Sequence, residues 1–219
     1  MEYFLHIPKT AGSSFTCFLD EHYEKEKIFP FQNWNDFLKK RPSNIPNYEL
    51  ARGHFGYCFH HVFGIEKINF MTILRNPIER TISQYHHMTV DRVNNNWIYE
   101  FPYSKIEHML YKCPWVISNI QVKHLAYDEN ILEKKIKFPY IFLENYENKN
   151  MEILFEKACF NLNKFIFIGI FEKIEKSIEY LCEKMNWQKT QINHINFLKN
   201  RPSIKNFKKR TIKKIEELN

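Results

Sequence analysis

The fold is decided by residues 3–15, YFLHIPKTAGSSF. The first five residues of this stretch are mostly apolar, and their number is typical of a strand that is covered on both faces. Pro8 ends the strand because proline lacks the N–H group that a central strand donates. Gly12 permits a tight turn, and we expect Ser13 and Ser14 to cap a following helix. The stretch therefore predicts a strand, a tight loop and a helix.

The start of this helix is suited to bind an anion. Backbone N–H groups, the positive end of the helix dipole and the Lys9 ammonium together favour a phosphate or sulfate. Each charge-assisted hydrogen bond to such a group contributes about 1.5–3 kcal/mol. The loop differs from the GxxxxGK[ST] loop of nucleotide kinases, because Lys9 precedes Gly12 instead of following it. A strand, turn and helix that bind nothing stay open as the alternative.

A second candidate anion site follows the strand that we expect at residues 68–74, INFMTIL. The next stretch, RNPIERTISQY at residues 75–85, begins a helix with Pro77 in its first turn. Arg75 stands at the end of the strand, and Ser83 lies about two helical turns further on. A bent entry into the helix would bring both side chains to one phosphate, Arg75 as a planar fork and Ser83 as a neutral donor.

Both motifs resemble those of sulfotransferases that use 3′-phosphoadenosine 5′-phosphosulfate (PAPS). The loop HIPKTAGSSF, residues 6–15, is similar to the 5′-phosphosulfate loop of their carbohydrate branch, which includes the heparan sulfate 2-O-sulfotransferases. Residues 75–85 match the RxPxxRxxSxY pattern that binds the 3′-phosphate in this family. The resemblance implies that PAPS is the co-substrate, that 3′,5′-adenosine bisphosphate (PAP) is the product, and that no metal is required.

The resemblance also implies a role for each residue of these motifs. Lys9 would stabilise the leaving oxygen of PAPS. His54, between two glycines in GHFG, would take the proton from the acceptor hydroxyl as general base, although a loop histidine that caps a carbonyl is the alternative. Arg75 and Ser83 would bind the 3′-phosphate. The 5′-phosphosulfate would be bound by the loop and the helix start: Lys9, Thr10, Ala11, Gly12, Ser13, Ser14 and Phe15.

Two further features of the helix after the second motif have more than one interpretation. We expect Arg80 to brace the preceding loop or to pair with an acid, either Glu79 or Glu144. The adjacent His86 and His87 suggest a metal site, but neighbouring residues on a helix point about 100° apart and do not bind one ion together. We therefore expect no metal at this pair.

The second half of the chain resembles the family at isolated positions. Asn119 and Gln121 match an NxQxxxL segment, which implies a place near the acceptor or the cofactor, although such residues also brace ordinary helices. The C-terminal tail of the family folds back toward the nucleotide, which implies that Lys199 or Arg201 reaches the 3′-phosphate. A family pattern is matched after the last expected strand by Gly169, Glu172, Ser177 and Leu181.

The hydrophobic pattern predicts an α/β fold. Further helices are expected at residues 13–25, 34–40, 104–111, 114–126 and 172–187 and in the lysine-rich tail. Further strands are expected at residues 48–57 and 165–171, with a possible strand at 139–143. This order favours a three-layer, P-loop-like domain whose mostly parallel sheet of four or five strands is flanked by helices. The ligand should bind at the carboxyl ends of the strands.

The composition limits the class and the partners of the protein. A chain of 219 residues fits one domain, which we expect over residues 1–219. A hydrophobic content of 44% excludes a disordered polymer, and a formal charge of +7 suits an acidic partner. The five cysteines show no CxxC pair, which favours a reducing compartment. Without a signal peptide or a long apolar run we expect a cytoplasmic protein, with the lumenal domain of a trimmed Golgi membrane protein as the alternative.

These observations favour a sulfotransferase that moves a sulfuryl group from PAPS to an acceptor hydroxyl. The family default is a saccharide acceptor, while a lipid, a small metabolite or a tyrosine stays open, as does the oligomeric state. A P-loop-type nucleotide kinase or other phosphotransferase would instead carry its lysine after the glycine and an acid after a strand. A non-catalytic polyanion-binding module would explain the charge but not two anion sites, and we expect no nucleic acid partner. A catalytically inactive relative also stays open.

Overall fold

The computed structural model of the chain describes residues 1–40, 47–90, 105–127, 150–188, 192 and 202–219. Among these residues, four parallel strands form one sheet in the order β2-β1-β3-β4. The strands are β1 (Glu2–Leu5), β2 (Leu50–Gly53), β3 (Asn69–Leu74) and β4 (Phe165–Ile170). The expected α/β class with a parallel central sheet is thereby confirmed.

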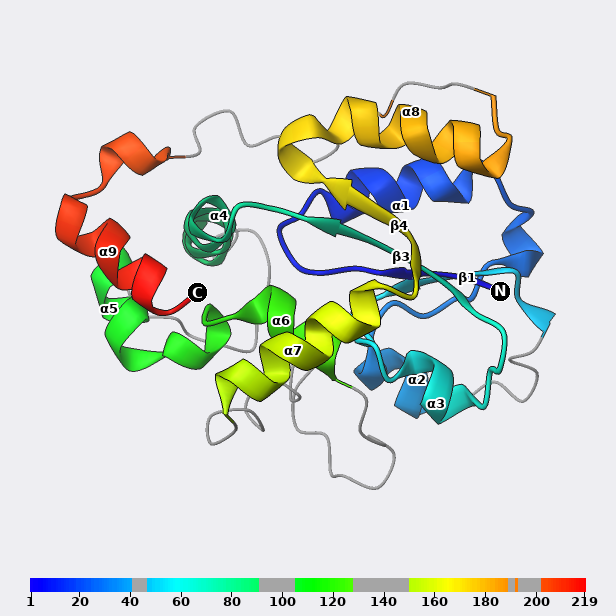
Figure 1. Ribbon diagram of the computed structural model, residues 1–219, viewed down its shortest axis with the longest axis horizontal. Helices are drawn as coiled ribbons and strands as arrows, with labels where there is room; N and C mark the ends of the chain where they lie inside the picture. The colour runs from blue at the N-terminus through cyan, green and yellow to red at the C-terminus, as the bar shows by residue number, and fades with distance from the viewer. Residues whose placement is uncertain (41–46, 91–104, 128–149, 189–191, 193–201) are drawn as a thin grey trace.

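Helices cover both faces of this sheet (Figure 1). One face carries α1 (Gly12–Asp20) and α8 (Ile174–Met185). The other face carries α2 (Trp34–Lys40), α3 (Phe59–Phe63), α6 (Ile120–Ala126) and α7 (Met151–Leu162). Successive residues of a strand point to opposite faces, so Phe4 packs in the first layer while Tyr3 and Leu5 pack in the second. The result is a three-layer arrangement in which Tyr3, Phe4 and Leu5 of β1 are fully buried.

A third group of helices packs beyond the carboxyl ends of the strands (Figure 1). It consists of α4 (Pro77–Val90), α5 (Ile106–Lys112) and α9 (Lys209–Glu217). Their apolar core contains Ile82, Leu110 and Ile215, all of which are buried. Short 3-10 turns occur at Lys25–Lys27, Pro114–Val116, Phe171–Lys173 and Ile204–Asn206. None of the helices in the described part of the chain is long and apolar enough to cross a membrane.

Several expected elements have different bounds in the structure. The helix expected at residues 13–25 ends at Asp20, and the helix expected at 114–126 is divided into a 3-10 turn and α6. The strand expected at residues 48–57 is limited to Leu50–Gly53. The possible strand at residues 139–143 lies outside the described residues.

Two helices, α3 and α7, were not predicted from the sequence. Helix α3 has only five residues, which is too short for a periodic signal. Helix α7 has apolar side chains around its circumference, because Ile153, Phe155 and Phe160 are exposed while Leu154 and Ala158 are buried. Its sequence therefore lacks the single apolar stripe that identifies a surface helix.

The strand order brings the ends of β1 and β3 together. From β1 the chain proceeds to β2 on one side, whereas β3 and β4 lie on the other side of β1. The order thus reverses between β1 and β3, and open parallel sheets bind their ligands outside the carboxyl ends of the strands at such a point. The two motifs predicted to bind anions follow these two strands.

Candidate active site

The loop between β1 and α1 contains two left-handed residues that are not glycine. The backbone φ angles are 70° at Lys9 and 69° at Ala11. Each such residue costs about 1–2 kcal/mol, and this kind of strain is concentrated at functional sites. Within the loop, the buried Thr10 hydroxyl donates a hydrogen bond to the carbonyl of Ile7 at 2.9 Å. Left-handed residues recur in the backbone nests that bind anions, so the strain lies where the phosphate site is predicted.

Helix α1 begins without a side-chain cap. Its N-cap residue is Ala11, so the prediction that Ser13 and Ser14 cap the helix is wrong, because both serines lie inside the first turn. The Phe15 N–H donates to the Ala11 carbonyl at 3.1 Å. The N–H groups of residues 12–14 precede this bond at the positive end of the helix dipole.

Phe15 has a structural role in the same turn. Its ring is fully buried, at 4.6 Å from the Phe4 ring and 5.7 Å from the Phe167 ring between centroids. Because its N–H also belongs to the helix, we do not retain Phe15 among the residues proposed to bind the phosphosulfate. The other members of the predicted set, from Lys9 to Ser14, lie in the loop or in the first turn of α1.

Gly12 permits the close approach of the His6 ring to α1. A Cβ atom at position 12 would lie 1.8 Å from His6 Nε2, so no other residue fits there without a shift of the ring. The His6 ring also contacts the ring of His54, and the two ring centroids are 4.1 Å apart. The helix start and the predicted general base are therefore connected through one buried imidazole.

The hydrogen bond of His54 defines its tautomer. Its Nδ1 lies 2.7 Å from the His6 carbonyl oxygen, which can only accept, so Nδ1 carries the proton and Nε2 carries the lone pair. The backbone of His54 is fixed as well, since its N–H donates to the Gln32 carbonyl at 2.7 Å. Gly53 makes this approach possible, because a Cβ there would lie 2.4 Å from Gln32 O. The tautomer is the one that a general base requires.

Burial keeps both imidazoles neutral. It lowers the pKa of His54 to about 4, against a smaller upward effect of the hydrogen bond to His6. The pKa of His6 is also well below its ordinary value, through burial and then through the nearby charges of His54, His124 and Lys9. The Lys9 ammonium thus acts on the His6 ring. At neutral pH His54 is an acceptor and not an acid.

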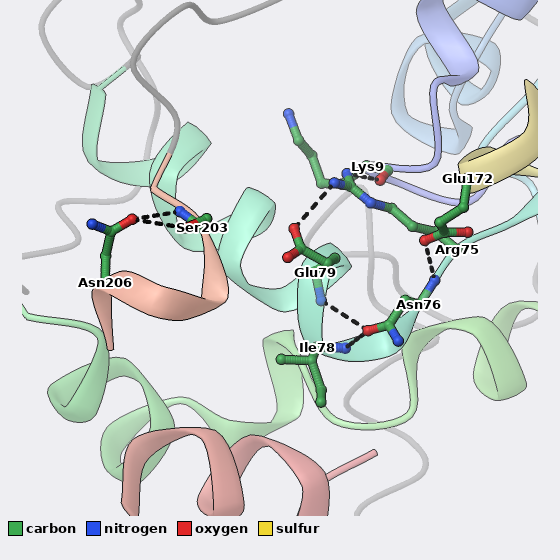
Figure 2. A network of polar contacts seen from close by, with 8 residues as sticks. All are labelled: Lys9, Arg75, Asn76, Ile78, Glu79, Glu172, Ser203 and Asn206. Carbon is green, nitrogen blue, oxygen red and sulfur yellow. Dashed lines mark hydrogen bonds and ion pairs between the residues drawn. The ribbon is translucent and has the colours of Figure 1, made fainter. Parts of the chain in front are cut away.

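The Arg75 side chain joins the second loop to the first (Figure 2). Its Nη1 donates to the Lys9 carbonyl at 2.9 Å, and its Nη2 lies 3.7 Å from Glu79 Oε2. The guanidinium also stacks over the Phe171 ring, 4.0 Å from the centroid. Only 6% of Arg75 is exposed. In Figure 2 the Lys9 side chain points away from Glu79, so the Lys9 carbonyl, and not its ammonium, makes this contact.

The Arg75 backbone is held by Gln121 of α6. The Arg75 N–H donates to Gln121 Oε1 at 2.9 Å, and Gln121 Nε2 donates to the Arg75 carbonyl at 2.8 Å. One side-chain amide therefore satisfies both backbone groups of the residue that follows β3.

Asn76 caps the helix that starts next to Arg75 (Figure 2). Its Oδ1 accepts from the N–H groups of Ile78 at 3.0 Å and Glu79 at 3.2 Å, which is the bonding pattern of an N-cap residue. Pro77 is the first residue of α4, as predicted. The Asn76 N–H donates to Glu172 Oε1 at 2.8 Å, so the turn after β4 supports the turn after β3.

Ser83 and Arg80 both lie on α4 and are buried. The guanidinium of Arg80 donates to the carbonyl of Ile117 at 3.1 Å, and burial, with a smaller effect of Arg75, lowers the pKa of Arg80 to about 9. Arg80 therefore has a bracing role, but it braces the segment before α6 at Ile117 and not, as was expected, the loop that precedes α4. Of the two acids expected as alternative partners, Glu79 lies 3.7 Å from the guanidinium of Arg75. The other candidate partner, Glu144, lies outside the described residues.

A comparison of the sequence with models of protein families shows which family the chain belongs to. A family model described as the sulfotransferase family matches residues 3–218, which include both motifs. The chain belongs to the sulfotransferase family. No curated protein matches the chain. The match assigns sulfotransfer as the general activity, while the donor and the acceptor are treated below as proposals.

In this sulfotransferase, the remaining positions predicted from the second half of the chain either brace the fold or lie outside the described residues. Asn119 braces the C-terminus, since its N–H donates to Leu218 O and Asn219 Oδ1, both at 3.1 Å. Lys199 and Arg201 lie outside the described residues. Within the ranges that the structure describes, no group of three or more His, Cys, Asp or Glu side chains is arranged to hold a metal ion.

Sequence reasoning missed the contacts that support Arg75 in this sulfotransferase. The stacking by Phe171 joins segments that are far apart in the sequence, and no local pattern reveals it. Gln121 had a signal, because it belongs to the NxQxxxL segment, but that segment did not indicate that its side chain holds the Arg75 backbone. Glu172 had a signal, because it belongs to the family pattern that begins at Gly169. That pattern did not indicate which backbone group Glu172 accepts from.

Proposed function

We propose that this protein transfers a sulfuryl group from PAPS to an acceptor hydroxyl, on a saccharide. The observation that carries the proposal is the contact between Arg75 Nη1 and the Lys9 carbonyl, 2.9 Å. It makes neighbours of the two motifs that resemble the 5′-phosphosulfate and 3′-phosphate sites of PAPS-dependent enzymes. A nucleotide with phosphate groups on both sides of one ribose fits two neighbouring anion sites, whereas a nucleotide with a single phosphate chain requires only one.

Each reacting group has a candidate partner in the proposed site. The 5′-phosphosulfate is bound by the loop and the start of α1, through Lys9, Thr10, Ala11, Gly12, Ser13 and Ser14. The 3′-phosphate is bound by Arg75 and Ser83. These assignments place the anions at a helix N-terminus and at a guanidinium, both of which are suited to bind phosphate.

The reaction forms a bond between the acceptor oxygen and sulfur, and it breaks the bond between sulfur and the bridging oxygen of the 5′-phosphate. His54 Nε2 takes the proton of the acceptor hydroxyl, in the tautomer that the His6 carbonyl fixes. The Lys9 ammonium stabilises the charge that develops on the bridging oxygen as PAP leaves. A base whose pKa is about 4 is weak, but the negative charge of a bound phosphosulfate raises the pKa of His54.

The choice of a saccharide rests on the resemblance to the carbohydrate branch. The basic surface supports an acidic acceptor, because the exposed face of α9 carries Lys209, Arg210 and Lys213 beside Lys208. Such a surface attracts a carboxylated or sulfated glycan more strongly than a neutral one.

The test is transfer from PAPS with a panel of acceptors that includes acidic glycans, neutral sugars, a phenol and a tyrosine peptide. PAP release and acceptor sulfation are measured together, and a thermal shift with PAP, AMP and ATP is recorded in parallel. We expect stabilisation by PAP above that by AMP or ATP, and sulfation of a saccharide. Stabilisation by ATP alone, or PAP release with no sulfated product from any acceptor, would overturn the proposal.

A further inference from the structure

We propose that Gln121 is a positioning residue for the 3′-phosphate site: by holding the backbone of Arg75 it sets the place of the guanidinium that binds this phosphate. The inference rests on the proposed function, and it assigns a specific task to a residue that the motif comparison placed only near the acceptor or the cofactor.

The contact has the form of a strand pairing. In an extended residue of a parallel sheet the N–H and C=O point to the same side, so a neighbouring strand can bind both. Arg75 lies one residue beyond the end of β3, and the Gln121 side chain binds both of its backbone groups, at 2.9 and 2.8 Å. A primary amide carries a donor and an acceptor like a peptide group, and Gln121 therefore extends the hydrogen bonding of β3 by one residue.

The segment that leads to Gln121 is held in place at two points. Two residues before it, Asn119 adopts a left-handed conformation and is bound to the last residues of the chain through Leu218 O and Asn219 Oδ1. Two residues before Asn119, the Ile117 carbonyl accepts from the buried Arg80. The segment that presents Gln121 is thus fixed to the two residues that follow α9 and to α4, which is the helix that also carries Ser83.

The position of the Arg75 backbone matters because its guanidinium has several partners. The side chain contacts the Lys9 carbonyl, Glu79 and the Phe171 ring. These partners belong to three separate segments: the loop after β1, helix α4 and the turn after β4. A displacement of the backbone changes all of these distances together. Binding sites lose effectiveness when their groups move by about 1 Å, so a residue that fixes the backbone affects the 3′-phosphate without touching it.

The experiment compares Gln121→Ala with a matched control, Asn161→Ala. Asn161 lies on α7, and its buried side-chain amide donates to the Leu125 carbonyl of α6 at 2.8 Å. Leu125 is near the opposite end of α6 from Gln121. Calorimetry measures the affinity of each variant for PAP and for AMP, which lacks the 3′-phosphate. Amide hydrogen exchange measures the protection of the Arg75 N–H without any ligand.

For Gln121→Ala we expect faster exchange at Arg75 and a loss of about five- to tenfold in PAP affinity, while the AMP affinity stays unchanged. The loss of an ordinary hydrogen bond changes an equilibrium constant by roughly this factor. For Asn161→Ala we expect a lower melting temperature, while exchange at Arg75 and both affinities match the wild type. A merely structural role of Gln121 would weaken PAP and AMP binding alike.

An isosteric variant covers the case in which Gln121→Ala fails to fold. In Gln121→Glu the carboxylate accepts from the Arg75 N–H but faces the Arg75 carbonyl with a second acceptor. We expect weaker PAP binding than in the wild type at pH 8, and recovery relative to the wild type as the pH falls and the new carboxyl becomes a donor.

The outcomes separate the two proposals. Equal PAP affinity in Gln121→Ala and the wild type, or equal losses of PAP and AMP affinity, would overturn the positioning role while leaving the proposed function intact. A wild-type protein that binds AMP as well as PAP, or neither, would overturn the proposed function and this inference with it. The wild-type affinities for PAP and AMP therefore test the proposed function before any variant is measured.

Discussion

The two strand-to-helix junctions proposed to bind one nucleotide are built in different ways. The first junction, from β1 to α1, is shaped by the backbone: Lys9 and Ala11 are left-handed, and no side chain caps α1. The second junction, from β3 to α4, is shaped by side chains: Asn76 caps α4 and Gln121 holds the backbone of Arg75.

This difference indicates how each junction recognises its phosphate. Backbone N–H groups at a helix start bind any tetrahedral anion, so the first junction supplies affinity. A guanidinium whose position is fixed by several neighbours binds a phosphate only at one place, so the second junction supplies selectivity for a 3′-phosphate. Substitutions should therefore act through backbone geometry at the first junction and through side-chain contacts at the second.

The largest effect should come from His54, which is attached to the first junction through the His6 carbonyl. We expect His54→Ala to lower kcat about 10²–10⁴-fold, the range for loss of a general base. PAP affinity should stay close to that of the wild type, because His54 is not in either proposed phosphate site. Steady-state kinetics with a PAP titration makes the test, and a variant that loses PAP binding but keeps its turnover would remove His54 from the role of base.

The pH dependence tests the state of the same residue. The pKa of His54 is about 4 in the free protein, below its ordinary value near 6.5, so the base is neutral at pH 7 and becomes protonated only as the pH falls toward 4. We expect kcat/KM to stay constant from pH 8 to about pH 5 and to decline below, because protonation removes the acceptor. A decline centred near pH 6.5 would show that the pKa of His54 is not lowered in the active protein.

Lys9 should have the next largest effect at the first junction. We expect Lys9→Ala to lower kcat about 10²–10³-fold, the scale found when one charge-stabilising donor is removed. The carbonyl that accepts from Arg75 is retained in this variant, so the second junction should keep its geometry. Unchanged turnover in the purified variant would contradict the role of Lys9 at the leaving oxygen.

Gly12→Ala sharpens the comparison through stability. The new methyl would meet the His6 ring, so we expect a loss of about 1–3 kcal/mol in the free energy of unfolding, as for other overpacked sites. The matched control is Ser13→Ala at the neighbouring exposed position, where no side-chain cap exists to be lost and the change should be small. Denaturant unfolding of both variants makes the measurement, and equal stabilities would contradict the close packing of His6.

The smallest effect should come from the cap of the second junction. Asn76→Ala removes the acceptor for two N–H groups of α4, and we expect a loss of about 1 kcal/mol in the free energy of unfolding. The same assay applies. A loss as small as that of Ser13→Ala would show that both junctions are shaped by the backbone, and the contrast between them would not hold.

The sequence predicted β1, β3 and β4 from their runs of apolar residues, although Ile168 and Ile170 of β4 are exposed. The strand that it predicted at residues 48–57 is shorter in the structure, because only Leu50–Gly53 pair with β1. The sequence also placed Lys9 and Arg75 at strand ends, since Pro8 and Pro77 mark the departures of the chain from the sheet. It did not predict that Ala11 would be the N-cap, because alanine carries no signal for a left-handed conformation. Nor did it predict the contact between Gln121 and Arg75, which depends on how separate elements pack and not on any local spacing.

The central claim is that the two junctions bind one nucleotide that carries both a 5′- and a 3′-phosphate. The most direct measurement is a calorimetric titration of the wild-type protein with PAP and with AMP under identical conditions. We predict that PAP binds about 100-fold more tightly, because a 3′-phosphate adds roughly two charge-assisted hydrogen bonds at about 1.5 kcal/mol each. Equal affinities for PAP and AMP would contradict the claim.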